Sequence, residues 1–181
     1  RIWRISYKDK ALVKTPNLVD ATDEALLDSL LSKNGYERHQ ARRVLTERGQ
    51  TIRKTLNRWT EKQEDEAALL QSLWMYQSID ELKPELLDQL LAAKDGRVRA
   101  AAVRVLRFWQ DRIGGSQNLL AKSVNDEHPR VRLEAVRALI HDPSAKAAAA
   151  VLEGLNHPVD RFLDYALWLS INDLSEPWVN A

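Results

Sequence analysis

The sequence predicts an all-α fold, a right-handed α-α superhelix of about five helix pairs, preceded by a short N-terminal β-strand. Two observations support the superhelix. A helical unit with a small-residue slot recurs at a spacing of about 29 to 33 residues, as expected for stacked supersecondary units, and two copies share the string Gly or Pro, then Val-Arg, Ala and Leu. Within each copy, apolar residues recur every three to four residues, which is typical of an amphipathic helix.

The first residues of the chain follow a different period. Trp3, Ile5 and Tyr7 alternate with polar residues, and this period of two predicts a strand over residues 1–8. One strand is not stable alone in water. We therefore expect it to complete the sheet of a neighbouring domain or to pack on the edge of the solenoid.

A linker separates this strand from the helices. Pro16 favours extended backbone in the residue before it, and no helical period appears before Thr22. The expected organisation is a strand and linker over residues 1–21 and a solenoid over residues 22–181. Because the chain starts at Arg1 and not at a methionine, we expect it to be a segment of a longer protein.

The first helix pair is expected from Thr22, a good N-cap followed by acidic residues that favour a helix N-terminus. Asn34 and Gly35 interrupt the pattern, and a second helix runs from Tyr36 until Gly49 ends it. The apolar faces of these two helices contain Leu26, Leu27, Leu30, Leu31, Ala41, Val44 and Leu45.

The second helix of the pair is the part that repeats most clearly. Residues 95–106 recur as residues 128–139, and weaker copies begin near Asn34, before Ser72 and at His157. The slot where the two helices of a pair must approach closely falls near positions 41, 72, 102, 135 and 164. No single pair can bury its apolar stripe, so the pairs are expected to stack.

Six tryptophans are many for a chain of this length. Trp74, Trp109 and Trp168 stand near the ends of predicted second helices, so we expect them to fill gaps between repeats. Trp59 precedes a charged stretch and is interpreted as an exposed anchor. We expect Trp178 near an interface with the rest of a longer chain.

Two sets of arginines recur with the repeat. The first set is expected to form a structural ladder, in which each guanidinium bonds to carbonyls or acids of the adjacent repeat. Candidate acids are Asp95, Asp126 and Asp142. The ladder contains Arg38, Arg99, Arg132 and Arg161.

The second set is expected to form a basic stripe on the concave face, if the second helices line that face. The stripe contains Arg43, Arg97, Arg104, Arg130 and Arg137. Glu47 and Glu134 dilute its charge. Three interpretations stay open: a solvated surface, a docking site for an acidic partner, and a site for nucleic-acid phosphate.

The string Asp/His-Gly/Pro-x-Val-Arg-x-x-Ala-x-x-x-Leu resembles HEAT repeats, including the bacterial group labelled phycobilisome-lyase-like. Residues 1–5, 34–49, 70–74 and 174–178 are similar to the HEAT segment of large membrane-bound dehydrogenases of planctomycete- and verrucomicrobium-type bacteria. This resemblance implies a β-propeller ahead of the segment, ending in the strand at residues 1–8, and a c-type haem domain after it. It also implies a periplasmic or extracytoplasmic location, with catalytic and haem residues outside this chain.

Composition argues against several kinds of site. The chain has no cysteine, which excludes disulfides and thiolate chemistry within it. His128 and His157 precede prolines in predicted turns, His39 lacks a partner one turn away, and His141 with Asp142 is half a metal site. No glycine-rich phosphate loop is present. We expect no catalytic, metal-binding or cofactor-binding residue.

The overall charge and hydropathy bound the partners. A net charge of +1 and a pI of about 8.2 do not predict a nucleic-acid partner. The longest apolar runs are too short to insert into a membrane. Protein partners are therefore expected, either the propeller and haem domains of the same chain or a separate protein.

The function predicted is a non-catalytic scaffold or protein-interaction module that spaces or docks domains within a larger dehydrogenase. One alternative is a free-standing solenoid that binds a peptide or protein. A less favoured alternative is an enzyme similar to HEAT-like DNA glycosylases or bilin lyases. That alternative needs aromatic and acidic residues together in the groove, for which Trp109 with Asp111 is the sequence candidate.

Overall fold

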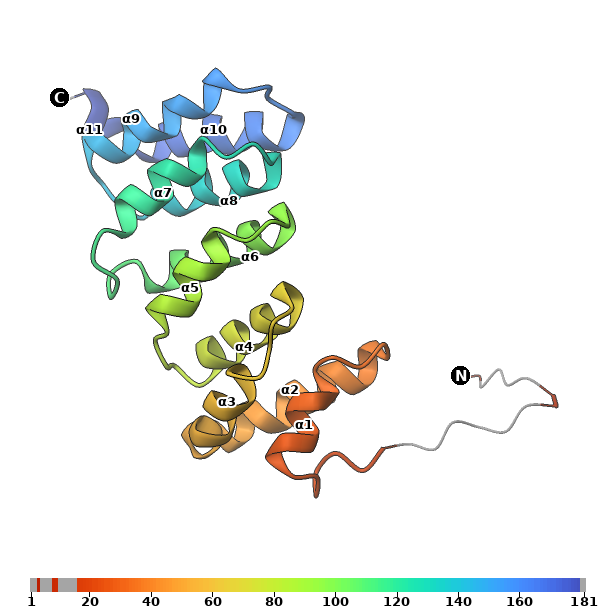
Figure 1. Cartoon of the computed structure of the whole chain (residues 1–181). Helices are drawn as coiled ribbons and strands as arrows, with labels where there is room; N and C mark the ends of the chain where they lie inside the picture. The colour runs from red at the N-terminus through yellow and green to blue at the C-terminus, as the bar shows by residue number, and fades with distance from the viewer. Residues whose placement is uncertain (1–2, 4–7, 10–15, 180–181) are drawn as a thin grey trace.

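A computed structural model describes residues 3, 8–9 and 16–179 of the chain, without the side chains of residues 177–178 (Figure 1). The described residues form helices and connecting segments, and none of them lies in a strand. The strand predicted over residues 1–8 and the start of its linker fall almost entirely outside the described residues.

Five antiparallel helix pairs follow one another among the described residues, which confirms the predicted all-α solenoid. The first helices of the pairs are α1 (Asp23–Ser29), α3 (Arg53–Thr60), α5 (Pro84–Leu91), α7 (Ser116–Val124) and α9 (Ala145–Glu153). The second helices are α2 (Gly35–Arg48), α4 (Glu66–Ser78), α6 (Gly96–Trp109), α8 (Pro129–Leu139) and α10 (Arg161–Asp173). Two 3-10 turns and a short last helix complete the list: Gly49–Ile52, Gly154–Asn156 and α11 (Ser175–Val179).

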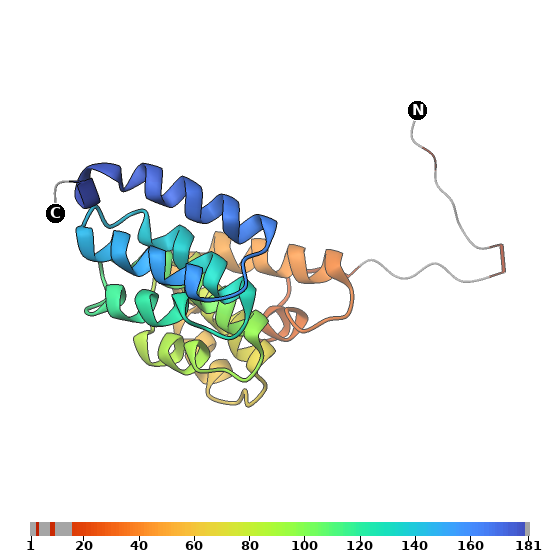
Figure 2. The same ribbon diagram turned by 90° about the horizontal axis from the view of Figure 1, so that it is seen from above.

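The helices form two layers along the stack. The second helices pack on one another in an unbroken row from α2 to α10. The first helices are more widely spaced, since α5 makes no comparable contact with α3 or α7 and a hollow of about 440 Å³ lies between α5 and α7. The closely packed row belongs on the inside of a curved stack, so the second helices line the concave face. Figures 1 and 2 show the stacked pairs from two directions.

Each second helix begins at a side chain that accepts a hydrogen bond from the first turn of the helix. These N-caps are Asn34, Asp65, Asp95, His128 and Asp160. Their spacing of 30 to 33 residues lies within the predicted period. A position within a second helix can therefore be named by its distance from the N-cap.

The close-approach slot is the seventh residue after the N-cap. Ala41, Ser72, Ala102 and Ala135 occupy it and are fully buried, as predicted. The slot predicted near position 164 is wrong, because Asp164 is exposed and Leu167 is the buried seventh residue. His157 does not cap α10: the chain stays extended through residues 158–160 and Asp160 is the cap.

Several aromatic and apolar residues differ from their predicted places. Trp59 is buried because α3 packs on α1, and its Nε1 donates to Asp28 at 2.8 Å, so the exposed-anchor interpretation is wrong. Trp109 is buried as predicted, whereas Trp168 is 61% exposed and stacks on exposed Tyr165. Leu31 is exposed because α1 ends before it.

Trp74 and Trp178 complete the set of predicted tryptophans. The Trp74 ring is partly buried against the core, and the Arg42 guanidinium lies over it at 5.1 Å from the ring centre. Trp74 therefore lies on the rim of the core, at the concave surface, instead of filling the space between repeats. The side chain of Trp178 lies outside the described residues.

Candidate functional site

The ladder arginines occupy the fourth position after the N-cap, at the start of three second helices. Arg99 and Arg132 are buried there, and Arg38 is partly buried. Arg161 is not part of the ladder, because it is the first residue of α10 and its exposed guanidinium lies over the ring of Phe162. The shifted cap at Asp160 moves the whole register of this repeat and places Asp164 at the ladder position.

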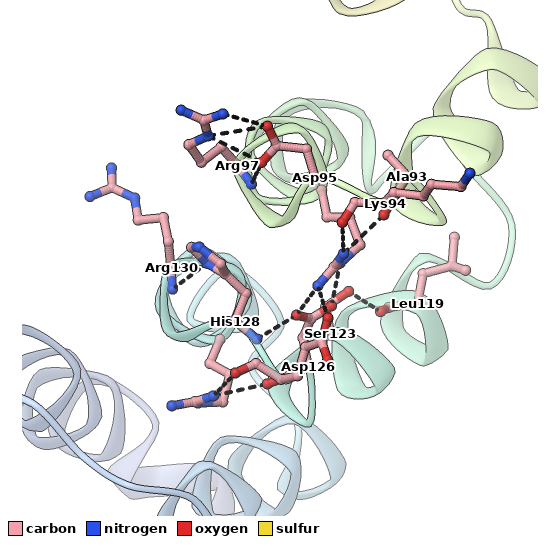
Figure 3. Close-up of polar contacts among 12 residues, drawn as sticks. Ala93, Lys94, Asp95, Arg97, Leu119, Ser123, Asp126, His128 and Arg130 are labelled. Carbon is pink, nitrogen blue, oxygen red and sulfur yellow. Dashed lines mark hydrogen bonds and ion pairs between the residues drawn. The ribbon is translucent and has the colours of Figure 1, made fainter. Parts of the chain in front are cut away.

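Arg99 connects two repeats through its hydrogen bonds to Ala93, Lys94 and Asp126, and Figure 3 labels these three partners. The Nη1 of Arg99 donates to the carbonyls of Ala93 and Lys94 in the turn before α6, at 2.9 and 3.0 Å. Its Nε and Nη2 each donate to the carboxylate of Asp126 in the following repeat, both at 2.8 Å. The predicted pairing with Asp126 is present in the structure, and it holds two turns in register.

Arg132 repeats this arrangement with carbonyls only. It donates to the carbonyls of Asp126 and Glu127 in its own repeat, both at 2.9 Å, and to Pro158 of the next repeat at 3.0 Å. Arg38 donates to the carbonyl of Ser32 in its own repeat at 2.6 Å. The ladder is thus a structural device whose guanidinium groups are used within the fold.

The other two candidate acids do not pair with the ladder. Asp95 accepts from Arg97, and these hydrogen bonds lower the pKa of Asp95 to about 2. Asp142 is partly buried and accepts no hydrogen bond at its Oδ2 among the described residues. Of the three candidate acids, only Asp126 pairs with a ladder arginine among the described residues.

The five stripe arginines are all exposed and lie on second helices. Arg97, Arg104 and Arg130 line one groove of about 390 Å³ between α4, α6 and α8. Arg137 lies on α8 outside the groove lining, and Arg43 lies on α2 beside Glu47, 3.6 Å away. The structure thus brings three of the five residues together.

The groove combines an apolar floor with a mixed rim. Ala100, Ala101 and Val105 of α6 form part of its lining, and Phe108 stands beside them with 63% of its surface exposed. The facing helices contribute Trp74 and Gln77 from α4 and Arg130 and Glu134 from α8. An exposed aromatic ring beside small apolar residues is suited to cover an apolar side chain of a ligand.

The guanidinium groups of the concave face differ in how they are neutralised. Arg97 pairs with Asp95 at 2.7 Å, and Arg130 pairs with the buried carboxylate of Glu134 at 2.8 Å. Among the described residues, Arg104 and Arg137 form no ion pair and no hydrogen bond. These two exposed cations are the stripe members that remain free to bind an anion.

A second hollow, missed by the sequence analysis, adjoins the groove. It is lined by Gly35, Arg38, His39, Arg42, Gln71 and Trp74, so the two hollows share Trp74. Arg42 bonds to Gln71 of the next repeat, and burial together with the nearby Arg38 lowers the pKa of Arg42. Arg42 reaches across this junction, but no other repeat has an arginine at the same position, so no periodic signal marked it.

The histidines serve local contacts. His128 caps α8, as predicted, through Nδ1, which accepts from the backbone N–H of Arg130 at 3.2 Å. The Nε2 of His141 accepts from Arg107 at 2.8 Å, and burial together with the Arg107 charge lowers the pKa of His141. Within the described part of the chain, no three His, Asp or Glu side chains gather as a metal site.

No described helix has the length and apolar character needed to span a membrane.

A comparison with protein families matches residues 83–171 to HEAT repeats. The match covers α5 to α9 and most of α10, including the α6 and α8 walls of the groove. No curated protein matches the chain.

Proposed function

We propose that this chain, whose residues 83–171 are a HEAT-repeat segment, is a non-catalytic scaffold that holds a protein partner along its concave face. HEAT repeats generally mediate protein interaction or scaffolding, and a fold by itself does not fix the partner. The observation that carries the proposal is the groove between α4, α6 and α8. It presents an exposed aromatic ring and small apolar residues beside arginines, which is the composition of a protein-binding surface.

The proposal includes a specific role within a larger protein. The scaffold spaces or docks the propeller and haem domains of a larger dehydrogenase at a periplasmic or extracytoplasmic site. A strand and linker over residues 1–21 join it to the propeller in this proposal, and the solenoid covers residues 22–181. Support for it comes from the sequence resemblance alone. A free-standing solenoid that binds a peptide uses the same concave groove.

An enzymatic role is less well supported by the groove. Trp109, one half of the sequence candidate, is buried, and only Asp111 is exposed. The groove does contain an acid near aromatic rings, Glu134, but its side chain is 4% exposed and paired with Arg130. A carboxylate held in this way is poorly placed to reach the reacting atom of a ligand. Binding is therefore the function that this geometry supports best.

A selection from a random peptide library tests the proposal. Phage-displayed peptides are selected on the immobilised chain, and the selected peptides are then measured by fluorescence anisotropy against two variants. Phe108→Ser removes the exposed ring of the groove, and Tyr165→Ser removes an equally exposed ring on α10. We expect the first variant to lose most of the binding and the second to keep it. If no selected peptide depends on Phe108, the proposed function is wrong.

A further inference from the structure

We propose that the concave face takes an extended acidic peptide in which two carboxylates stand three residues apart and an apolar residue lies next to one of them. This inference rests on the proposed function and names the chemistry of the partner. Two features of the second helices carry it: the positions of the two unpaired arginines, and the apolar floor beside one of them.

Arg104 and Arg137 are equivalent residues of neighbouring repeats. Each is the ninth residue after its N-cap, on α6 and α8 respectively. The axes of packed helices lie about 8–10 Å apart. Equivalent side chains on these two adjoining helices are therefore offset by about that distance along the stack.

A polyproline II helix matches this offset. It has three residues per turn and rises about 3.1 Å per residue, so side chains three residues apart lie on one face, about 9 Å from each other. In a β-strand, by contrast, side chains three residues apart point to opposite faces. A peptide in polyproline II conformation that runs across α6 and α8 can present one carboxylate to each arginine. Guanidinium–carboxylate hydrogen bonds are among the strongest that an exposed surface offers.

The apolar part of the proposed ligand follows from Phe108. This residue lies one helical turn after Arg104, and side chains four residues apart on a helix are neighbours. A carboxylate bound to Arg104 therefore places an adjacent residue of the ligand over Phe108 and the groove floor. Ala101 in that floor is partly exposed and provides contact surface without a polar group that would need a partner.

A nucleic acid fits this surface less well than an acidic peptide. Arg97 and Arg130 are already neutralised by Asp95 and Glu134, so a run of phosphates would meet few free cations. Phosphate-binding surfaces gain most of their affinity from many such cations. Two unpaired arginines, one of them beside an apolar floor, correspond to a short ligand with two acids.

Synthetic peptides test the inference directly. The probe is a fluorescein-labelled proline-rich peptide with the central order Glu-Leu-Pro-Glu, and its binding is followed by fluorescence anisotropy. One comparison peptide carries Gln in place of both acids, and another carries the two acids side by side. The peptide with adjacent acids can reach one arginine, so we expect the probe to bind about tenfold more tightly than it. The Gln peptide can reach neither arginine, so we expect the probe to bind about a hundredfold more tightly than it, since one charge-assisted hydrogen bond accounts for about tenfold.

Matched variants of the chain locate the binding. Arg104→Gln and Arg137→Gln should each weaken the probe by about tenfold. Arg58→Gln is the control, because Arg58 is also exposed but lies on α3 in the other layer. It should leave the affinity unchanged. Equal binding of the Gln peptide, or full binding by Arg104→Gln, would overturn the inference, and so would tighter, steeply salt-dependent binding of a labelled single-stranded oligonucleotide.

The library selection separates this inference from the proposed function. Selected peptides that depend on Phe108 but lack paired acids would overturn the acidic-peptide inference and leave the scaffold function standing. A selection with no peptide that depends on Phe108 would overturn both.

Discussion

Arg99 and Asp126 form a two-pronged ion pair across the junction of two repeats, with both N–O distances at 2.8 Å. The Arg99 side chain is 11% exposed and that of Asp126 is 16% exposed. The same guanidinium closes the turn before α6 through two carbonyls. One side chain thus fixes a turn and the position of the next helix pair.

Removing the Arg99 side chain is expected to lower the free energy of unfolding. Breaking this largely buried pair leaves the Asp126 charge with only the backbone hydrogen bond from His128 and removes the Arg99 donor from two carbonyls, a loss of about 3 kcal/mol or more. Arg99→Ala should lower the free energy of urea unfolding by this amount. Arg97→Ala removes an exposed arginine two residues away and should change the free energy of unfolding little. Equal effects of the two variants would show that the Arg99 pair does not stabilise the stack.

The Asp126 carboxylate predicts a loss of stability in acid. Burial alone would raise the pKa of Asp126, but hydrogen bonds from Arg99 and from the His128 backbone outweigh it and hold that pKa below its ordinary value. A folded-state pKa below the unfolded value of about 3.9 stabilises the protein above that pH, and the contribution is lost as pH falls through the folded value. Unfolding should be measured at pH 7 and pH 3 for the parent chain and Asp126→Asn. The variant should lose less stability between these pH values, and an unchanged loss would contradict the assignment.

Gly96 is expected to tolerate no side chain. A Cβ built on Gly96 would lie 2.5 Å from the ring of His128, the N-cap of the next second helix. Gly96→Ala should therefore destabilise the fold by about 1–3 kcal/mol. The matched change Gly35→Ala meets only a guanidinium end at 3.6 Å and should be tolerated. Thermal unfolding of both variants checks this, and a neutral Gly96→Ala would show that the junction can relax.

The two tryptophans Trp109 and Trp168 should respond oppositely to truncation. Trp109 is 2% exposed, and its change to Ala should cost about 3–5 kcal/mol. Trp168 is 61% exposed, and its change to Ala should alter the free energy of unfolding by at most about 0.5 kcal/mol. Chemical denaturation distinguishes them. A large decrease in the free energy of unfolding on truncating Trp168 would mean that the Trp168 face of α10 is buried in solution.

Much of the solenoid could be predicted from sequence because its packing repeats. Alanine recurs at the seventh position after three of the five N-caps, and Ala41, Ala102 and Ala135 are all buried there. The last repeat was misread because His157-Pro158 copies the string at His128-Pro129. Three further extended residues move the cap to Asp160, and a local string cannot reveal that insertion.

The candidate site was predictable only in part. Periodicity identified exposed arginines on one face, but it could not show that Asp95 and Glu134 neutralise two of them. It also missed the contacts of Arg42 with Trp74 and Gln71, because they join one pair of neighbouring repeats and appear nowhere else among the described residues. Residue identities that do not repeat carry no periodic signal, although they shape the surface.

The most direct test of the proposed concave binding face is a ¹H–¹⁵N NMR titration of the chain with a peptide from the library selection. The account predicts shifted amide signals on α4, α6 and α8, near Gln77, Ala101 and Arg104. Signals of α5 and α7 on the opposite layer should stay in place. Shifts concentrated on α5 and α7, or on the exposed rings of α10, would contradict it.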